Sequence, residues 1–116
     1  MAVDFETLRQ IALAFPGMEE GYSYGTRAFR VRKKFFARMK EDGETLVLKV
    51  GDLEKAFLLE AEPAVYFSTD HYDGYPAVLI HLPIIKPEDL RDVIEKAWRK
   101  MAARRDLAAY DSRSDS

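Results

Sequence analysis

The sequence predicts an α+β fold, a two-layer sandwich in which helices near both ends of the chain cover one face of an antiparallel sheet. Apolar residues recur at three- and four-residue steps near both ends of the 116-residue chain, which is typical of amphipathic helices. In the middle of the chain they alternate with polar residues, which is typical of strands with one buried face. Turn residues divide this alternating part into short segments, so the expected order is α-β-β-β-α-β-β-α.

The first helix is expected to begin after Asp4, a suitable N-cap. Its apolar side chains lie one turn apart at Phe5, Leu8, Ile11, Ala12 and Phe15. The pair Pro16-Gly17 ends it. Residues 18–26 contain two glycines and show no period, so they are expected to form a loop.

Residues 27–50 alternate with period two and are expected to form three strands. Residues 41–44 supply the turn between the second and third strands, whereas Arg32 and Lys33 are a poor turn pair between the first and second. One side of the strands is apolar, and the opposite side, expected to be open to water, carries Arg30, Phe36, Arg38, Lys40, Val47 and Lys49. The sequence therefore predicts a sheet face that collects cations.

The second half of the chain repeats the mixture of helix and strand. A short helix is expected from Asp52 to just before Pro63. Strands are expected at residues 65–68 and 77–82, and a long helix with an apolar stripe from Pro87 onward. Residues 1–105 are expected to form a single domain, and residues 106–116 a flexible tail.

Composition excludes several classes of protein. With 47% hydrophobic and 33% charged residues, the chain has the balance of an ordinary globular protein. It contains no cysteine, which excludes disulfides, thiolate metal sites and cysteine nucleophiles. Its apolar runs are far shorter than the roughly 20 residues of a membrane span, and its acidic N-terminal region is unlike a signal peptide. We therefore expect a cytoplasmic protein without a membrane partner.

The strongest charge feature is the segment 27–40, which holds seven basic residues and no acidic one. The rest of the chain has 11 basic and 20 acidic residues, so the segment carries +7 within a net charge of −2. Cations interleaved with rings on a sheet suit nucleic acid, because phosphates need the cations and bases stack on the rings. The alternative is that the row is merely the solvated face of a half-buried sheet.

The candidate DNA-binding residues fall into two groups, one on the open sheet face and one at the tip of the first hairpin. They are Arg30, Phe36, Arg38, Lys40 and Lys49 on the face, and Arg32, Lys33 and Lys34 at the tip. We expect sequence-tolerant binding, because the sequence offers no recognition helix with base-reading side chains.

A second candidate site is the loop that precedes the last predicted strand. It concentrates the polar and aromatic residues Asp70, His71, Tyr72, Asp73 and Tyr75. Such a loop could bind a small molecule or a protein partner, although ordinary turn chemistry also explains it. The chain has only two histidines, and its glycines match no nucleotide-binding motif, so no metal and no cofactor are predicted. An enzyme that uses His71 with Asp70 or Asp73 for acid–base chemistry is a third alternative, but no catalytic residues are predicted, because the sequence specifies neither a nucleophile nor a positioned acid–base pair.

Several blocks, spread over nearly the whole chain, resemble the MmcQ/YjbR family of small bacterial proteins. They are Phe15-Pro16-Gly17, Tyr24-Gly25-Thr26, Ala28-Phe29-Arg30-Val31, Lys34-Phe35-Phe36-Ala37, His71-Tyr72-Asp73-Gly74-Tyr75-Pro76 and Ala97-Trp98-Arg99. The resemblance implies a CyaY-like (frataxin-like) sandwich and a double-wing DNA-binding protein. Lys33 stands where the family usually has glycine and Arg27 where it often has proline, and both departures add positive charge. The iron binding of frataxins is not carried over, because the first helix offers only Asp4 and Glu6.

Overall fold

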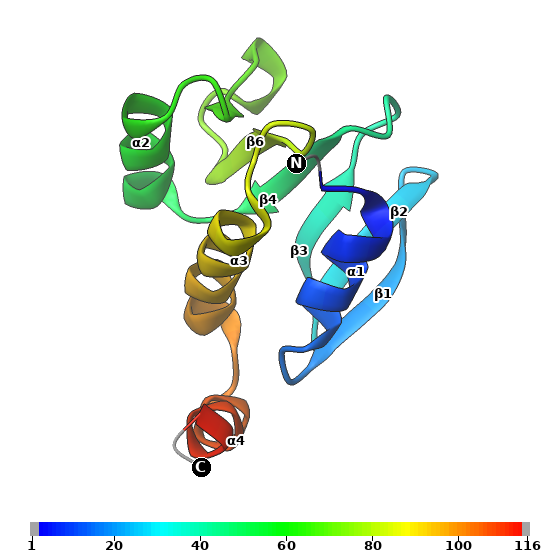
Figure 1. Ribbon diagram of the computed structural model, residues 1–116, viewed down its shortest axis with the longest axis vertical. Coiled ribbons are helices and arrows are strands. Elements are labelled where there is room, and N and C mark those ends of the chain that lie inside the picture. The colour runs from blue at the N-terminus through cyan, green and yellow to red at the C-terminus, as the bar shows by residue number, and fades with distance from the viewer. Residues whose placement is uncertain (1–2, 115–116) are drawn as a thin grey trace.

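The computed structural model describes residues 3–114 and has two layers, a six-stranded sheet and a layer of helices (Figure 1). The elements in chain order are α1 (Phe5–Leu13), β1 (Met18–Ser23), β2 (Thr26–Val31), β3 (Lys34–Met39), β4 (Thr45–Lys49), α2 (Asp52–Ala61), β5 (Tyr66–Phe67), the 3-10 turn η1 (Asp70–Tyr72), β6 (Ala77–His81), α3 (Pro87–Met101) and α4 (Arg104–Ser114). The sheet order is β1-β2-β3-β4-β6-β5, with every neighbouring pair antiparallel. The predicted α+β sandwich is therefore confirmed.

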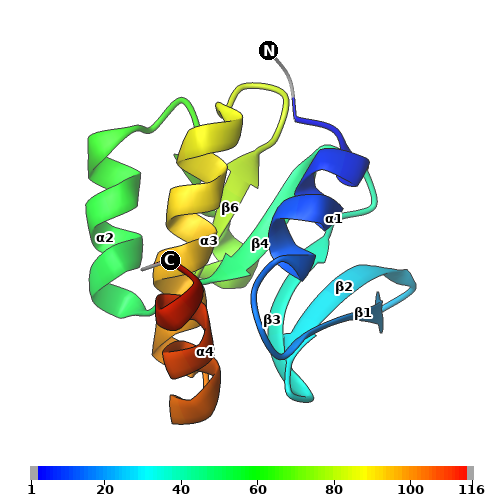
Figure 2. The same ribbon diagram turned by 60° about the horizontal axis from the view of Figure 1, so that its bottom comes forward.

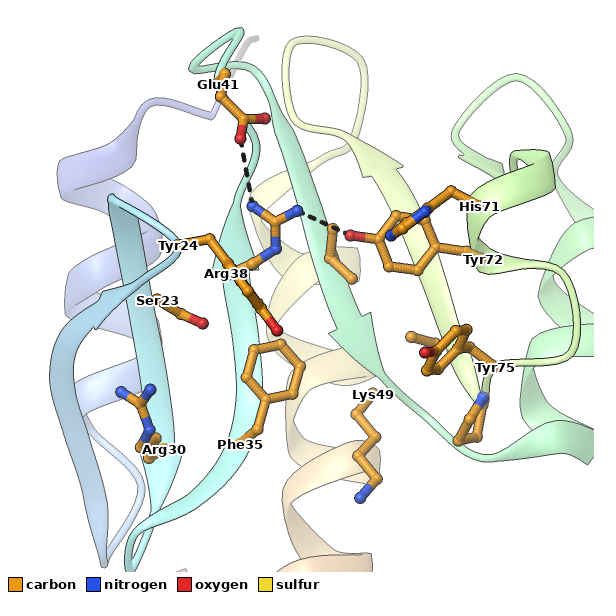
Figure 3. Close-up of a pocket in the computed structure, with 13 residues that line it drawn as sticks. Ser23, Tyr24, Arg30, Phe35, Arg38, Glu41, Lys49, His71, Tyr72 and Tyr75 are labelled. Carbon is orange, nitrogen blue, oxygen red and sulfur yellow. Dashed lines mark hydrogen bonds and ion pairs between the residues drawn. The ribbon is translucent and has the colours of Figure 1, made fainter.

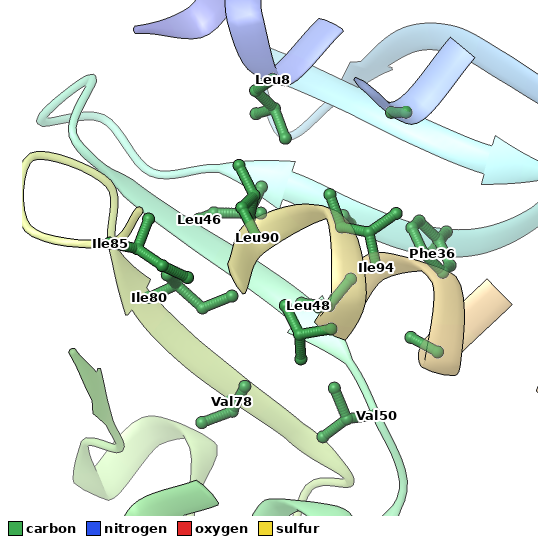
Figure 4. Packing of buried hydrophobic residues seen from close by; sticks show 14 of the residues in the cluster. Leu8, Phe36, Leu46, Leu48, Val50, Val78, Ile80, Ile85, Leu90 and Ile94 are labelled. Atoms are coloured by element: carbon green, nitrogen blue, oxygen red, sulfur yellow. The ribbon is translucent and has the colours of Figure 1, made fainter. Parts of the chain in front are cut away.

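The helices α1 and α3 cover the same face of the sheet, and α2 lies beside α3 (Figure 2). The apolar stripe of α3 is buried against the central strands; the main core includes Leu46, Leu48, Val78, Ile80, Leu90 and Ile94 (Figure 4). Asp4 caps α1 as predicted, because its Oδ1 accepts a hydrogen bond of 2.8 Å from the backbone N–H of Thr7. Within residues 3–114, no helix combines the length and the apolarity that crossing a bilayer requires.

The strand β1 was not predicted, because residues 18–26 were expected to form a loop. It lies at the edge of the sheet and pairs in continuous register with β2, from Met18 opposite Val31 to Ser23 opposite Thr26. The strand is nowhere fully buried, so it has no apolar alternation to reveal it. Such polar, partly exposed edge strands also discourage pairing with other chains.

A β-bulge in β3 corrects the prediction for Phe36. Phe29 pairs with Ala37 and Arg30 pairs with Phe35, which leaves Phe36 as an extra residue. A bulge of this kind interrupts the alternation of side chains between the two faces. Phe36 and Ala37 therefore both belong to the main core, with Phe36 only 1% exposed. The prediction that Phe36 lies on the open face is wrong.

The hairpin between β2 and β3 turns tightly despite its unfavourable sequence. Arg32 and Lys33 have φ values of 48° and 75°, and two successive positive values fit a two-residue type I′ turn. The turn predicted at residues 41–44 joins β3 and β4, and there Asp42 accepts hydrogen bonds from the backbone N–H groups of Glu44 and Thr45. Both predicted hairpins are therefore present.

Helix α4 occupies residues for which a flexible tail was expected. Its Asp106 is buried and accepts hydrogen bonds of 2.7 and 2.8 Å from the Nε and Nη2 of Arg32. Tyr110 packs against the rings of Phe15 and Trp98. Residues 104–114 are therefore helical, and residues 115–116 lie outside the described part of the chain.

The pair formed by Arg32 and Asp106 should stabilise the fold only while Asp106 is ionised. Hydrogen bonding from Arg32 lowers the pKa of Asp106 below its ordinary value of 3.8. A group with a lowered folded-state pKa contributes stability that is complete above its unfolded pKa and is lost as the pH falls through its folded pKa. We expect Asp106→Asn to lower the melting temperature at neutral pH, and the difference from the wild type to close in acid.

Thermal melts followed by circular dichroism over a series of pH values would measure this difference. Asp73→Asn, which changes an exposed carboxylate, is the matched control and should shift the melting temperature little at any pH. A difference for Asp106→Asn that is as large in acid as at neutral pH would contradict the role given to the ion pair.

Candidate functional site

The face of the sheet opposite α1 and α3 carries a groove of about 770 Å³. One wall is the turn between β1 and β2, the other is the loop of residues 68–76, and β3, β4 and β6 form the floor (Figure 3). The groove is lined by Ser23, Tyr24, Arg30, Phe35, Arg38, Glu41, Val47, Lys49, His71, Tyr72, Tyr75, Pro76 and Ala77. Segments far apart in the sequence therefore build a single concave surface.

Three cations from three adjacent strands line the groove. The strand register places Arg38 of β3 opposite Ala28 of β2 and Val47 of β4, so its side chain shares their face. Arg30 and Lys49 lie on the same face, toward the opposite end of the groove from Glu41 (Figure 3). Glu41 is the one carboxylate in the lining, and its Oε2 is 3.9 Å from Nη1 of Arg38. The described groove therefore has a net positive charge.

Arg38 is held in a fixed position. Its side chain is only 12% exposed, and its Nη2 donates a hydrogen bond of 2.9 Å to the hydroxyl of Tyr72. Its Nη1 donates one of 3.3 Å to the hydroxyl of Thr26, and its guanidinium lies 5.6 Å from the ring centre of Tyr24. Arg38 thus joins the two walls across the floor.

The loop of residues 68–76 is a preformed wall. Tyr72 is buried against Val47, Ala77 and Leu79, so this loop covers part of the face that was expected to be open. Lys55 of α2 reaches the loop and donates hydrogen bonds of 2.7 Å to the carbonyl oxygens of both Tyr72 and Tyr75. These bonds hold the loop while leaving the Tyr75 ring 59% exposed.

A family model described as YjbR matches residues 13–100, which include every residue of the groove. The chain belongs to the YjbR family. It is 42% identical over 69 residues to uncharacterized proteins of Mycobacterium tuberculosis and Mycobacterium bovis. Each match covers 59% of this chain and 54% of the relative, so the chain spans about half the length of the curated relatives it matches.

The fold of this YjbR chain is also that of a solved structure. A Deinococcus radiodurans protein with a DUF419 family domain superposes with a TM-score of 0.70, covering 91% of this chain and 86% of that one. The two sequences are 19% identical, so the likeness shows the fold alone.

The YjbR chain brings only part of the predicted DNA-binding set together. Arg30, Arg38 and Lys49 meet in the groove. Arg32 is paired with Asp106, and Lys40 places its Nζ 5.7 Å from the ring centre of Tyr72 without lining the groove. The remaining predicted residues lie elsewhere: Lys33 and Lys34 are exposed at the hairpin tip, and Phe36 is in the core.

Only some residues of the predicted ligand loop line the groove. His71, Tyr72 and Tyr75 line the groove, whereas Asp70 and Asp73 are exposed and outside its lining. The ring of His71 lies edge-on to Tyr72 with 4.9 Å between ring centres. The basic strands and this loop, considered as separate sites from the sequence, are therefore two sides of the same groove.

Seven of the lining residues were not among the predicted site residues: Ser23, Tyr24, Phe35, Glu41, Val47, Pro76 and Ala77. Tyr24 lies in a stretch expected to be a loop, and its ring is 87% exposed. Phe35 was assigned to the core side and changes face because of the bulge in β3. Ser23 is the last residue of β1 and Glu41 lies in the turn between β3 and β4, and nothing in their sequence context distinguishes them from ordinary surface residues. The one usable signal in the sequence was Gly25, because a glycine in a polar stretch often marks a tight turn.

Proposed function

We propose that this YjbR chain binds DNA with little sequence preference, through the groove on its open sheet face. The observation that carries the proposal is the convergence of Arg30, Arg38 and Lys49, from three neighbouring strands, on a groove with a single carboxylate in its lining. Phosphates supply most of the affinity in sequence-tolerant binding, and they require cations gathered in this way. Exposed rings on both walls supply surfaces for stacking.

We propose binding with little sequence preference because the cations on the groove floor are suited to contacts with phosphates. Contacts to phosphates fix the position of a protein on DNA but do not read the sequence. The net charge of the chain is −2, so attraction is local to the basic parts of the surface, and salt should weaken it strongly. Lys33 and Lys34 at the exposed hairpin tip are available for further phosphate contacts, whereas Arg32 is held by Asp106. A cytoplasmic location is part of the proposal.

The salt dependence of binding tests this function. If the three groove cations each neutralise one phosphate, affinity for a short oligonucleotide should fall roughly 20- to 40-fold between about 50 and 200 mM salt. Arg30→Gln/Lys49→Gln should weaken binding and make the logarithmic salt slope shallower by about 1.4–1.8, because two of the phosphate contacts are removed. Fluorescence anisotropy with a labelled oligonucleotide would measure both quantities.

The control for this test removes the same charge from the layer of helices. Lys86→Gln/Arg104→Gln changes two exposed cations near the ends of α3 and α4, and the salt slope should stay as in the wild type. If the two double variants weaken binding equally, or if the wild type binds no oligonucleotide at low salt, the proposed function is wrong.

The second candidate function is binding of a small anionic molecule at the same groove. It is favoured by a volume of about 770 Å³, which lies in the range of ligand pockets, and by a wall built from His71, Tyr72 and Tyr75. Such a ligand would raise the melting temperature, because it binds only the folded chain. A metabolite that does so at micromolar concentration and displaces the oligonucleotide would favour this function over DNA binding.

A further inference from the structure

The proposed DNA-binding function leaves open whether the groove takes a duplex or a single strand. We propose that it takes unpaired DNA, with bases stacking on Tyr24 and Tyr75 and phosphates lying against Arg30 and Lys49. This inference rests on the proposed function and adds the class of its substrate.

The backbone of Tyr24 has an unfavourable conformation, and the contacts of its side chain in the free chain compensate little for this. With Gly25 it forms the two-residue turn between β1 and β2, and their φ values are 53° and 78°. Positive φ is uncommon for a residue with a bulky side chain. The residue is nevertheless 87% exposed, and the Arg38 guanidinium lies 5.6 Å from the ring centre. A large flat ring exposed over a basic groove is what base stacking requires.

Tyr75 supplies a second ring on the opposite wall (Figure 3). It is 59% exposed, its backbone is held by Lys55, and its ring lies edge-on to Tyr72 at 6.1 Å. Because Lys55 and Tyr72 fix the loop, the ring is positioned before any ligand arrives. Preformed rings make stacking more favourable, since less conformational freedom is lost on binding.

Three cations line the same groove as these rings. Arg38 is only 12% exposed, and Arg30 and Lys49 line the same groove below Tyr24 in Figure 3. A duplex keeps its bases stacked on one another and shows only their edges, so neither tyrosine ring would find a base face. A single strand can present a phosphate to Arg30 and Lys49 and a base to each ring at once.

The hairpin tip lacks the features expected of a wing that enters a duplex groove. Arg32 donates two hydrogen bonds to Asp106 of α4, and Phe36 is 1% exposed in the core. Lys33 and Lys34 are then the exposed basic residues left at this tip, and lysines suit phosphates in any nucleic acid. The features specific to base recognition are therefore in the groove, on the tyrosine rings.

The test compares a short labelled oligodeoxythymidine with a duplex of the same length, using the whole chain. Single-stranded DNA should bind at least tenfold more tightly than the duplex. Tyr24→Ala and Tyr75→Ala should each weaken single-strand binding by roughly 5- to 150-fold, the loss expected for one stacked base. Both rings are exposed, so the variants should fold, which melting curves would verify. Tyr22→Ala, which removes a ring that is 65% exposed outside the groove lining, is the control and should bind as the wild type.

The outcomes separate this inference from the proposed function. If single strand and duplex bind equally well and Arg30→Gln/Lys49→Gln weakens both, the groove binds DNA but the inference is overturned. It is also overturned if Tyr24→Ala and Tyr75→Ala bind like Tyr22→Ala, or if oligouridine binds more tightly than oligodeoxythymidine. If neither form of DNA binds, the proposed function fails and the inference fails with it.

Discussion

Phe36→Ala is expected to lower the free energy of unfolding by about 3–5 kcal/mol, the usual cost of removing a fully buried phenylalanine ring. The ring is 1% exposed and belongs to the main core. The alternation of β3, by contrast, predicts Phe36 on the open face, where its removal would be nearly neutral. Urea denaturation followed by far-UV circular dichroism would measure the difference.

Phe35→Ala is the matched control, since it removes the same ring from the adjacent residue. Phe35 is half-buried and lines the groove, so its removal should cost about 1 kcal/mol, in proportion to the smaller apolar area it hides. A larger loss for Phe35→Ala than for Phe36→Ala would mean that β3 runs without the bulge. It would also mean that the strands carry their side chains as simple alternation predicts.

The bulge explains why the sequence predicted the sheet but misplaced part of its surface. Alternation identifies a strand from the average of its positions, so β2, β3 and β4 were all expected. The register between strands depends on tertiary packing, and one extra residue reverses the faces of those beyond it. Arg30 keeps the predicted face because β2 has no extra residue, and Arg38 keeps it because the β3 residues after the bulge follow the predicted alternation. Phe35 and Phe36 exchange faces.

The elements that the sequence missed are those without a buried stripe. Strand β1 has no fully buried residue, and α4 has weak amphipathic character in a strongly polar sequence. Each is held by contacts with residues distant in the sequence. β1 pairs with β2 along its length, and α4 is fixed by the ion pair between Asp106 and Arg32, 74 residues away. Local patterns cannot report such contacts, because propensity is a weak determinant compared with tertiary packing.

The candidate groove also depends on contacts between residues that are distant in the sequence. The sequence identified a run of cations and, separately, a polar loop, because each is continuous along the chain. Their meeting depends on the hydrogen bond between Arg38 and Tyr72 and on the support that Lys55 gives the loop. Ion pairs also determine which cations are available to contact a phosphate. Arg27 is bound to Glu20 and Arg32 to Asp106, whereas Arg30 and Lys49 have no ion pair within residues 3–114.

Trp98→Ala is the second substitution expected to cost about 3–5 kcal/mol of stability. The indole is fully buried in α3, and its ring packs against Phe15 and Tyr110 with centres 5.2 and 5.1 Å away. It therefore joins the end of α1, α3 and α4. Because this is the chain's single tryptophan, unfolding of the variant must be followed by circular dichroism. Faster amide exchange across residues 104–113 would show that α4 loses its support.

Trp98→Phe separates the packing of the indole from its hydrogen bond. The Nε1–H donates a bond of 2.9 Å to the carbonyl oxygen of Pro16, and phenylalanine keeps most of the apolar area while leaving that carbonyl without its donor. An unsatisfied buried acceptor costs about 1–3 kcal/mol, so this variant should lie between Trp98→Ala and the wild type. If Trp98→Phe is as unstable as Trp98→Ala, the hydrogen bond makes the larger contribution to stability. If Trp98→Phe matches the wild type, the carbonyl of Pro16 accepts a hydrogen bond from water instead, and packing alone holds α4 against α3.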